Sequence, residues 1–275
     1  MELRTQRYTT LGISAANRRR LEQLHRASRG ILTVAEAARI LAIDANTAAR
    51  LLAHWRAQGW IQRVRRGLYV LVPLGAVGRV GVVADPWILI ARAFAPCYIG
   101  GWSACEHWDL TEQIFREVVV ITSKPVRPRR GQIGGSGYLA RVVAPKHLFG
   151  TRRVWREQTP VDVSDPSRTI IDILDVPALG GGIRHVAEVV RVYFASEHRN
   201  DRQLVEYGRR LGNHTVFKRL GFLLERFGLD ANDLLAECRR AKSAGYARLD
   251  PSSPARGRLV RRWGLQLNVE VPAGR

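Results

Sequence analysis

Apolar residues recur at helical spacing along the first part of the chain. A helix is predicted over about Ala15 to Ser28, with Leu21 and Leu24 facing inward and Ser14 as its cap. We expect this helix to pack behind the two that follow it.

The next stretch, from Thr33, combines a helix-start signal with a short apolar stripe. Thr33 followed by Glu36 is a capping box, in which each side chain satisfies a backbone donor of the first turn. The stripe consists of Val34, Ala37, Ala38 and Leu41. It predicts a short amphipathic helix, with the turn after it at Ala42 and Ile43.

A longer helix is predicted from the N-cap Asp44 to about Gln58, ending at Gly59. Its apolar side carries Ala48, Leu51, Leu52 and Trp55, and its polar side carries Asn46, Thr47, Arg50 and His54. Polar side chains near a helix N-terminus suit contacts with base edges and phosphates. Such a face on an isolated helix is usually only solvated, so the DNA interpretation depends on what surrounds this helix.

Two strands are predicted after this helix, over Ile61 to Val64 and Leu68 to Leu71. The turn between them is basic, with Arg63, Arg65 and Arg66 on or beside it. The order of helices and strands is that of a winged helix-turn-helix, which places one helix in the DNA major groove. An arginine-bearing wing suits the DNA backbone or minor groove, although a solubilising hairpin remains the alternative.

A change of composition marks the end of this module. Residues 72–80 contain Pro73, Gly75 and Gly78, which is typical of a linker. We therefore predict an α+β protein with a winged helix-turn-helix DNA-binding domain over residues 1–76. A larger mixed α/β domain, with a helical C-terminal part, is predicted over residues 77–275.

Patterning in the second part predicts further helices and strands. The expected helices cover 85–94, 165–174, 183–196, 201–211, 214–227 and 232–241, and the expected strands cover 118–122, 138–143, 153–157 and 161–164. Tyr98 to Leu110 is interpreted as a buried helix opened by Gly100 and Gly101. Lys124 to Gly137 is interpreted as a basic loop, and Arg261 to Val271 as a strand that returns to the sheet.

Charge strengthens the case for a polyanionic partner. The chain of 275 residues has a formal net charge of +20, which favours nucleic acid over most other partners. Residues 1–80 alone hold 14 arginines against four acidic residues, so the charge is densest where the helix-turn-helix lies. A ribosome-associated or membrane-surface protein would also fit the charge.

Other classes receive little support. Cys97, Cys105 and Cys238 form no disulfide or CxxC pattern, so we expect buried thiols and no metal or cofactor. The N-terminus has no apolar signal region, and no stretch is long and apolar enough for a membrane span, which predicts a cytoplasmic protein.

Catalytic motifs are also missing from the sequence. GxSxG, HExxH and Walker patterns are absent, none of the four lysines follows a Glu by two residues, and the basic loop lacks the GK[ST] ending of a P-loop. The acidic residues Asp162, Asp165, Asp172 and Asp175 are spaced suggestively for a metal. Asp165 is more simply a helix cap, and the last two are expected on the polar side of its helix. We therefore predict that the protein is not an enzyme.

Several segments together resemble a known family. They are RRGLYVLVPL at the end of the wing, YIGGWSACEHWDLTEQIF (98–115), VSDPSRTIIDILDVPALGGG (163–182) and RRWGLQLNV (261–269). In this order they resemble the AbiEi-type antitoxins of bacterial abortive-infection, or type IV, toxin–antitoxin systems, which act in phage defence.

The resemblance implies a transcriptional autorepressor that binds operator DNA with inverted repeats through its N-terminal domain. It also implies an antitoxin that counteracts a nucleotidyltransferase-like toxin encoded beside it, in the type IV view without stable contact. The family's DNA-binding roles transfer to Asn46, Thr47, Arg50 and the wing 63–66. A possible antitoxin surface consists of Trp102, Ser103, His107 and Arg168, for which core packing or capping is the alternative.

Two other functions stay open at this point. One is a stand-alone winged-helix regulator whose C-terminal domain binds a ligand or mediates dimerisation. The other is an RNA-binding protein, which the same positive charge would serve.

Overall fold

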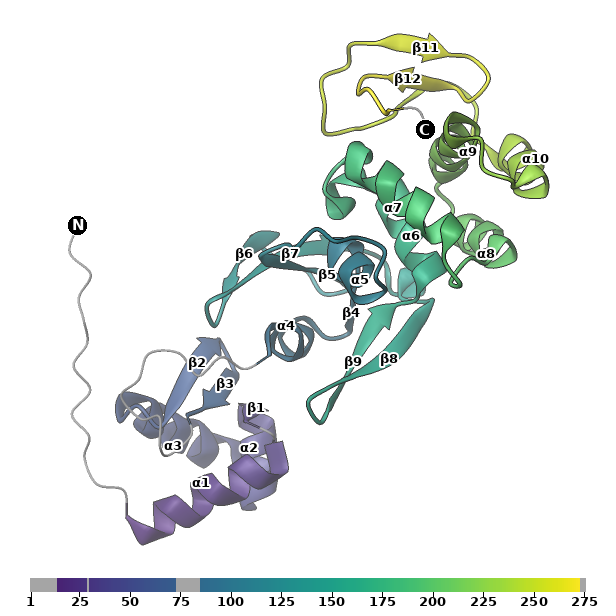
Figure 1. Ribbon diagram of the computed structural model, residues 1–275. Coiled ribbons are helices and arrows are strands. Elements are labelled where there is room, and N and C mark those ends of the chain that lie inside the picture. Colours follow the sequence, from purple (N-terminus) through teal and green to yellow (C-terminus); the bar gives the residue numbers. More distant parts are fainter. Residues whose placement is uncertain (1–13, 29, 73–84, 273–275) are drawn as a thin grey trace. The chain divides into compact units, whose positions relative to one another are not determined.

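The computed structural model describes residues 14–28, 30–72 and 85–272, and the chain divides into two compact units (Figure 1). The first unit contains Met1–Ala93 together with Gln132–Ser136 and Trp155–Pro160. The second contains Phe94–Gly131, Gly137–Val154 and Val161–Arg275. The predicted domain boundary at residue 76 falls within residues 73–84, outside the described residues.

The N-terminal module has the element order of a winged helix-turn-helix, as predicted. The elements are α1 (Ala15–Ser28), β1 (Ile31–Thr33), α2 (Val34–Leu41), α3 (Ala45–Ala57), β2 (Ile61–Arg65) and β3 (Leu68–Leu71). β3 pairs antiparallel with β1 on one side and with β2 on the other. The sequence did not indicate β1, because its three residues are too few to show an alternating pattern.

Caps and a compact core hold this module together. Thr33 and Glu36 form the predicted capping box at the start of α2, and the Asp44 side chain accepts hydrogen bonds from the first amides of α3. Leu21, Leu52 and Trp55 are at most 1% exposed in the core between the helices and the sheet. A module this small buries only a modest core, so these side chains fix how α3 is presented.

One more helix belongs to the first unit. α4 (Pro86–Phe94) is preceded by Asp85, whose Oδ1 accepts hydrogen bonds from the amides of Trp87 and Ile88 at 2.8 and 3.3 Å. Proline at the first helical position is favourable because its missing N–H would be unpaired there in any case.

A six-stranded mixed sheet follows. Its strands are β4 (Cys97–Ile99), β5 (Glu117–Thr122), β6 (Arg130–Ile133), β7 (Ser136–Val142), β8 (Thr151–Arg156) and β9 (Thr159–Ser164), in the order β6-β7-β5-β4-β9-β8. β5 runs parallel to β7 and antiparallel to β4, and β4 runs parallel to β9. The central strands are apolar on both faces, which is typical of strands covered on both sides.

Two predictions for this region were wrong in part. Tyr98 to Leu110 is not one helix, because Tyr98 and Ile99 lie in β4 and only Gly101–His107 forms the helix α5. Gly100 and Gly101 allow the abrupt change of direction: a Cβ on Gly101, whose φ is +55°, would lie 2.4 Å from the Leu179 carbonyl oxygen. The basic segment from Lys124 to Gly137 is not wholly a loop, since it contains β6 and the first residues of β7.

Helices dominate the rest of the second unit, as the patterning predicted. They are α6 (Pro166–Asp175), α7 (Ile183–Ala195), α8 (Asp201–Leu211), α9 (Thr215–Phe227) and α10 (Asn232–Ala241), with a short 3-10 helix at Pro177–Gly180. Every residue of α6 is buried, and α5, α7, α8 and α9 pack around it.

The chain ends in a small sheet of its own beside α9 (yellow in Figure 1). It contains β10 (Ala247–Arg248), β11 (Arg258–Val260) and β12 (Leu265–Leu267), with β12 in the middle. The expectation that residues 261–271 return to the main sheet was therefore wrong. Trp263 anchors the small sheet instead: a Cβ on Gly221 of α9 would lie 2.1 Å from its ring.

Candidate nucleic-acid interface

The solvent-facing side of α3 carries the residues predicted to read DNA. Asn46, Arg50 and His54 follow one another at four-residue spacing and are exposed, while Thr47 is half-buried. This spacing places them along one face of the helix, opposite the buried Leu52. The hydrogen-bond donors and acceptors of these side chains therefore face solvent and not the protein core.

The first turn of α3 is held firmly. Asp44 Oδ1 accepts hydrogen bonds from the amides of Asn46 and Thr47 at 3.0 and 2.9 Å. Hydrogen bonds from the hydroxyl and the amide of Thr47 lower the pKa of Asp44, so its carboxylate is ionised at neutral pH. The Arg50 guanidinium lies 3.5 Å from the Thr47 hydroxyl. These contacts orient the polar end of α3.

The wing is a tight hairpin whose arginines differ in their surroundings. Its turn is formed by Arg66 and Gly67, and Gly67 has a φ of +80°, which favours glycine. Arg63, Arg65 and Arg66 are all exposed. Arg65 differs because its Nη1 donates to the carbonyl oxygen of Ala93 at 2.6 Å, at the C-terminal end of α4. Arg65 thus satisfies a helix-end carbonyl, which leaves Arg63 and Arg66 better placed for phosphate.

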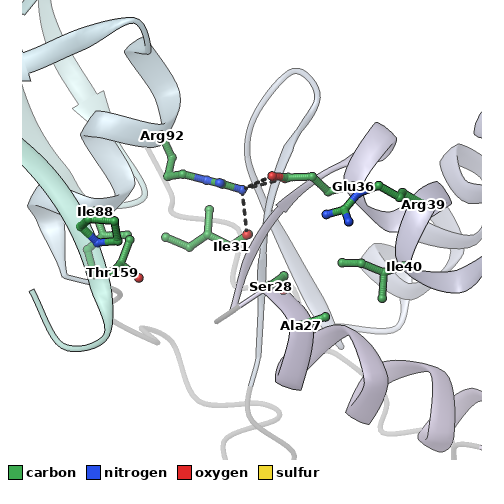
Figure 2. A pocket seen from close by; sticks show the side chains of 10 residues that line it. Ala27, Ser28, Ile31, Glu36, Arg39, Ile40, Ile88, Arg92 and Thr159 are labelled. Atoms are coloured by element: carbon green, nitrogen blue, oxygen red, sulfur yellow. Dashed lines mark hydrogen bonds and ion pairs between the residues drawn. The ribbon is translucent and has the colours of Figure 1, made fainter. Parts of the chain in front are cut away.

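A pocket of about 350 Å³ is lined by residues of α1, α2 and α4 (Figure 2). Arg92 of α4 reaches into it and binds both carboxylate oxygens of Glu36, at 2.6 and 2.7 Å, and the carbonyl oxygen of Ile31 at 3.3 Å. Burial pushes the pKa of Glu36 upward, but hydrogen bonds from Thr33 and Arg92 outweigh it, and the net shift is downward. Arg92 therefore supports the capping box that starts α2.

Sequence reasoning missed the roles of Arg65 and Arg92. Arg92 is 56 residues from Glu36, and Arg65 is 28 residues from Ala93. Local patterning carries no signal for contacts at such separations. The one signal in the sequence was the acidic capping residue Glu36, whose carboxylate can attract a cation.

The residues suggested as an antitoxin surface are mostly in the interior of the second unit. Trp102, Ser103 and Arg168 are 6%, 3% and 1% exposed. The Trp102 indole donates to the carbonyl oxygen of Glu117 at 2.6 Å, and Ser103 Oγ accepts from the amide of Val119 at 3.0 Å. These two side chains attach α5 to β5 and are not available for a partner to touch.

His107 and Arg168 lie in different environments. His107 is half-buried with its ring against Trp108, at 4.5 Å between centroids. Arg168 pairs with Asp172 one turn along α6, at 3.0 Å, and donates to the hydroxyl of Tyr98 at 3.0 Å. Burial raises the pKa of Asp172, and the adjacent Arg168 cation opposes that rise.

Asp172 and Asp175 were expected on the polar side of α6, but both are buried in the structure. Asp172 is 1% exposed and Asp175 is 7% exposed. Each has partners: Asp172 accepts from Tyr98, and Asp175 from Arg141 and Asn213. Asp165 is the helix cap that was predicted, because its Oδ1 accepts from the Arg168 amide at 2.8 Å.

The described residues contain neither a candidate metal site nor an ionised thiol. Within residues 14–28, 30–72 and 85–272, no group of three or more His, Cys, Asp or Glu side chains is placed to hold a metal ion. Burial raises the pKa of Cys97 and Cys238 to about 12 and that of Cys105 further, so these thiols stay protonated. No helix in the described part of the chain has the length and apolar character needed to cross a bilayer.

Comparison with known proteins supports the N-terminal interpretation. Residues 19–72 match a family described as "Transcriptional regulator, AbiEi antitoxin", which confirms the resemblance over the winged helix-turn-helix. The match covers the winged helix-turn-helix and does not extend into the second unit. A search of curated proteins finds no match.

A solved structure resembles nearly the whole chain. The RV2827C protein from Mycobacterium tuberculosis has a TM-score of 0.63 over 92% of this chain and 92% of its own, at 15% sequence identity. At this identity the similarity concerns the fold alone. It shows that the arrangement of elements described above occurs in an experimentally determined structure.

Proposed function

We propose, starting from the match of residues 19–72 to this family of antitoxin regulators, that the protein represses its own operon by binding inverted repeats in operator DNA. The observation that carries the proposal is the exposed face of α3. Asn46, Arg50 and His54 lie in line on the helix that a winged helix-turn-helix inserts into the major groove.

The side chains suit separate tasks in this proposal. Arg50 is suited to a guanine edge and Asn46 to an adenine edge, because both side chains form bidentate hydrogen bonds with those bases. Thr47, Arg63 and Arg66 would contact phosphates and fix the register of the helix on the duplex. Arg65 would act indirectly, by holding the wing against the end of α4.

The second part of the proposal concerns the rest of the chain. We propose that residues 77–275 form the antitoxin domain, which counteracts a nucleotidyltransferase-like toxin encoded beside this gene. Trp102, Ser103 and Arg168 would serve this function by supporting the fold, since all three are buried. A surface that touches the toxin is not required, because neutralisation in such systems does not need stable contact.

DNA reading is tested by fluorescence anisotropy with the upstream operator duplex and a scrambled duplex of the same length. Arg50→Ala should weaken operator binding by about 1–3 kcal/mol, the usual value of a bidentate base contact, and should change scrambled-duplex binding little. Arg191→Ala, an exposed arginine of α7, removes the same charge elsewhere and should leave operator selectivity intact. Unchanged operator affinity in Arg50→Ala would show that α3 does not read this site.

Neutralisation is tested separately, by co-expressing the adjacent gene with the full chain and following growth. The wild type and Arg50→Ala should both restore growth, because Arg50 lies in the DNA-binding module and not in the proposed antitoxin domain. If the wild type fails to restore growth while operator binding persists, the protein is a regulator without antitoxin activity.

A further inference from the structure

The positive charge of the second part of the chain is concentrated in one short segment. Residues 239–262 hold eight basic residues and a single acidic one, Asp250, which is 3% exposed. All other residues after position 80 are nearly balanced, with 22 basic and 19 acidic side chains. A general excess of arginine does not explain such a local concentration.

The segment folds around a pocket of about 400 Å³ in the second unit. The pocket lies between the end of α10, the loop 242–246 and the turn that precedes β12. Arg239, Lys242, Tyr246 and Arg261 line it. We call these four residues the C-terminal basic pocket.

The loop that forms the pocket is fixed by hydrogen bonds from beneath. The buried Lys218 of α9 donates from Nζ to the carbonyl oxygens of Ala244 and Gly245, at 3.1 and 2.7 Å. Lys242 donates to the carbonyl oxygen of Arg262 at 2.6 Å and so joins the loop to the following turn. The pocket is therefore built by its own framework and does not depend on a ligand for its shape.

The local potential is positive despite two acidic neighbours. Glu225 binds Arg239 at 2.8 Å and Arg262 at 3.1 Å, and Glu237 binds Arg240, but two carboxylates cannot balance the eight basic side chains of residues 239–262. The surroundings of Lys218 show the same excess: burial lowers its pKa most, and the cations of Lys242 and Arg219 lower it further. A basic residue at the end of α10 also stabilises the helix dipole, but Arg261 lies outside any helix.

Tyr246 gives the pocket a second chemical property. Its side chain is 52% exposed, although a tyrosine more often buries its ring. An exposed ring surrounded by cations offers a surface on which an unpaired base can stack while its phosphates meet arginine or lysine.

We propose that the C-terminal basic pocket binds a single-stranded nucleic acid, with phosphates on Arg239, Lys242 and Arg261 and an unpaired base on Tyr246. The base faces of a duplex are already stacked on each other, so a duplex would use the charges and not the ring. Single strands of RNA and of DNA both offer phosphates and unpaired bases, so both are candidates. The proposal rests on the second unit alone and is independent of operator reading by α3.

The test measures binding of the full chain to labelled oligonucleotides of about 12 nucleotides, a length within the usual range of single-strand sites. One arm uses single-stranded RNA, one uses single-stranded DNA of the same sequence, and one uses the operator duplex. Tyr246→Ala and Arg261→Ala should each weaken single-strand binding by roughly tenfold, as expected for losing one stacked base or one phosphate contact. Tyr246→Phe keeps the ring and should bind like the wild type, and so should Arg191→Ala.

The arms separate the possible results. Selective loss of single-strand binding in Tyr246→Ala and Arg261→Ala, with operator binding retained, supports the proposal, and the tighter strand identifies RNA or DNA. Wild-type binding to neither strand, or equal binding by all variants, overturns it. An equal loss on the operator duplex would assign the pocket to duplex contact, and full displacement of the oligonucleotide by polyglutamate at equal charge would assign it to acidic polypeptides. Each of these also overturns the proposal.

Discussion

Arg168 and Asp172 lie one turn apart on α6 with side chains that are each about 1% exposed. The guanidinium is also enclosed by aromatic rings: its carbon lies 4.0 Å from the centre of Phe149 and 5.8 Å from that of Tyr98. Removing charges from water is costly, and such a pair persists only where each charge has a partner. The pair therefore makes α6 intolerant of losing either member alone.

We expect Arg168→Met to destabilise the protein by about 3–5 kcal/mol, because Asp172 would remain buried without its cation. Chemical denaturation near neutral pH measures this loss. The double variant Arg168→Met/Asp172→Leu should recover much of the stability, since it removes both charges. Arg191→Met, on the surface of α7, is the control for the substitution itself and should change stability little. A double variant no more stable than Arg168→Met would contradict this account.

The same variant should show a distinct dependence on pH. The pKa of Asp172 is already raised in the folded protein by burial, and Arg168 holds it down in part. Without Arg168 the pKa rises further, so the folded state binds the proton more tightly than the unfolded state does. The destabilisation should therefore be largest above the folded pKa of Asp172, and should shrink as the pH falls from that pKa toward the lower pKa of the unfolded state. A loss that is constant with pH would show that Asp172 does not carry it.

Individual site residues differ in how far the sequence could place them. Asn46 and Arg50 could be placed from spacing alone, because a capped helix fixes which side chains share a face. Trp102 and Arg168 were suggested as part of a possible antitoxin surface, with core packing as the alternative, and both lie in the interior. Arginine usually faces solvent, and only the tertiary fold brings Tyr98 to Arg168.

At the scale of elements, the turn between α2 and α3 contains a strained residue. Ala42 has a φ of +52° and is exposed. A residue with a Cβ adopts this left-handed conformation at a cost of roughly 1–2 kcal/mol, which glycine avoids. The turn sets the angle between the two helices, so the strain is maintained by their packing.

Ala42→Gly should therefore stabilise the folded protein by up to about 1 kcal/mol. This value is smaller than the strain relieved, because glycine also gives the unfolded chain more conformational freedom. Ala53→Gly, in the middle of α3 and also exposed, makes the same substitution at a helical position and should destabilise by about 1 kcal/mol. Thermal unfolding of the two variants measures the predicted gain in stability for Ala42→Gly and the predicted loss for Ala53→Gly. If Ala42→Gly is as destabilising as Ala53→Gly, the turn is not strained.

Most elements were predictable where their signals are local. α8 and α10 begin and end at the predicted residues, and α3 follows from its cap at Asp44. β4 was not found because it is only three residues long and pairs with β5 and β9, which are distant in sequence. β6 was not found because its four residues do not show an alternating apolar pattern. The small sheet was missed because a short alternating segment does not indicate which strands it joins, and β12 pairs with β10 and β11.

On the scale of the whole molecule, the net charge of +20 falls into two concentrations. One covers the winged helix-turn-helix, and the other is the segment 239–262. Each phosphate neutralised by a cation releases counterions, so affinity falls with salt at a slope set by the number of contacts. The salt dependence of each nucleic acid therefore reports which concentration binds it.

This gives a prediction that joins both proposals. For the operator duplex, Arg66→Ala should reduce the slope of log affinity against log salt by about 1, the value for one lost phosphate contact. Arg261→Ala should leave that slope unchanged. For a single strand the roles should reverse, with Arg261→Ala reducing the slope by roughly 0.7 and Arg66→Ala leaving it intact. If both variants reduce both slopes equally, the charge acts as one diffuse field, and neither concentration is a separate site.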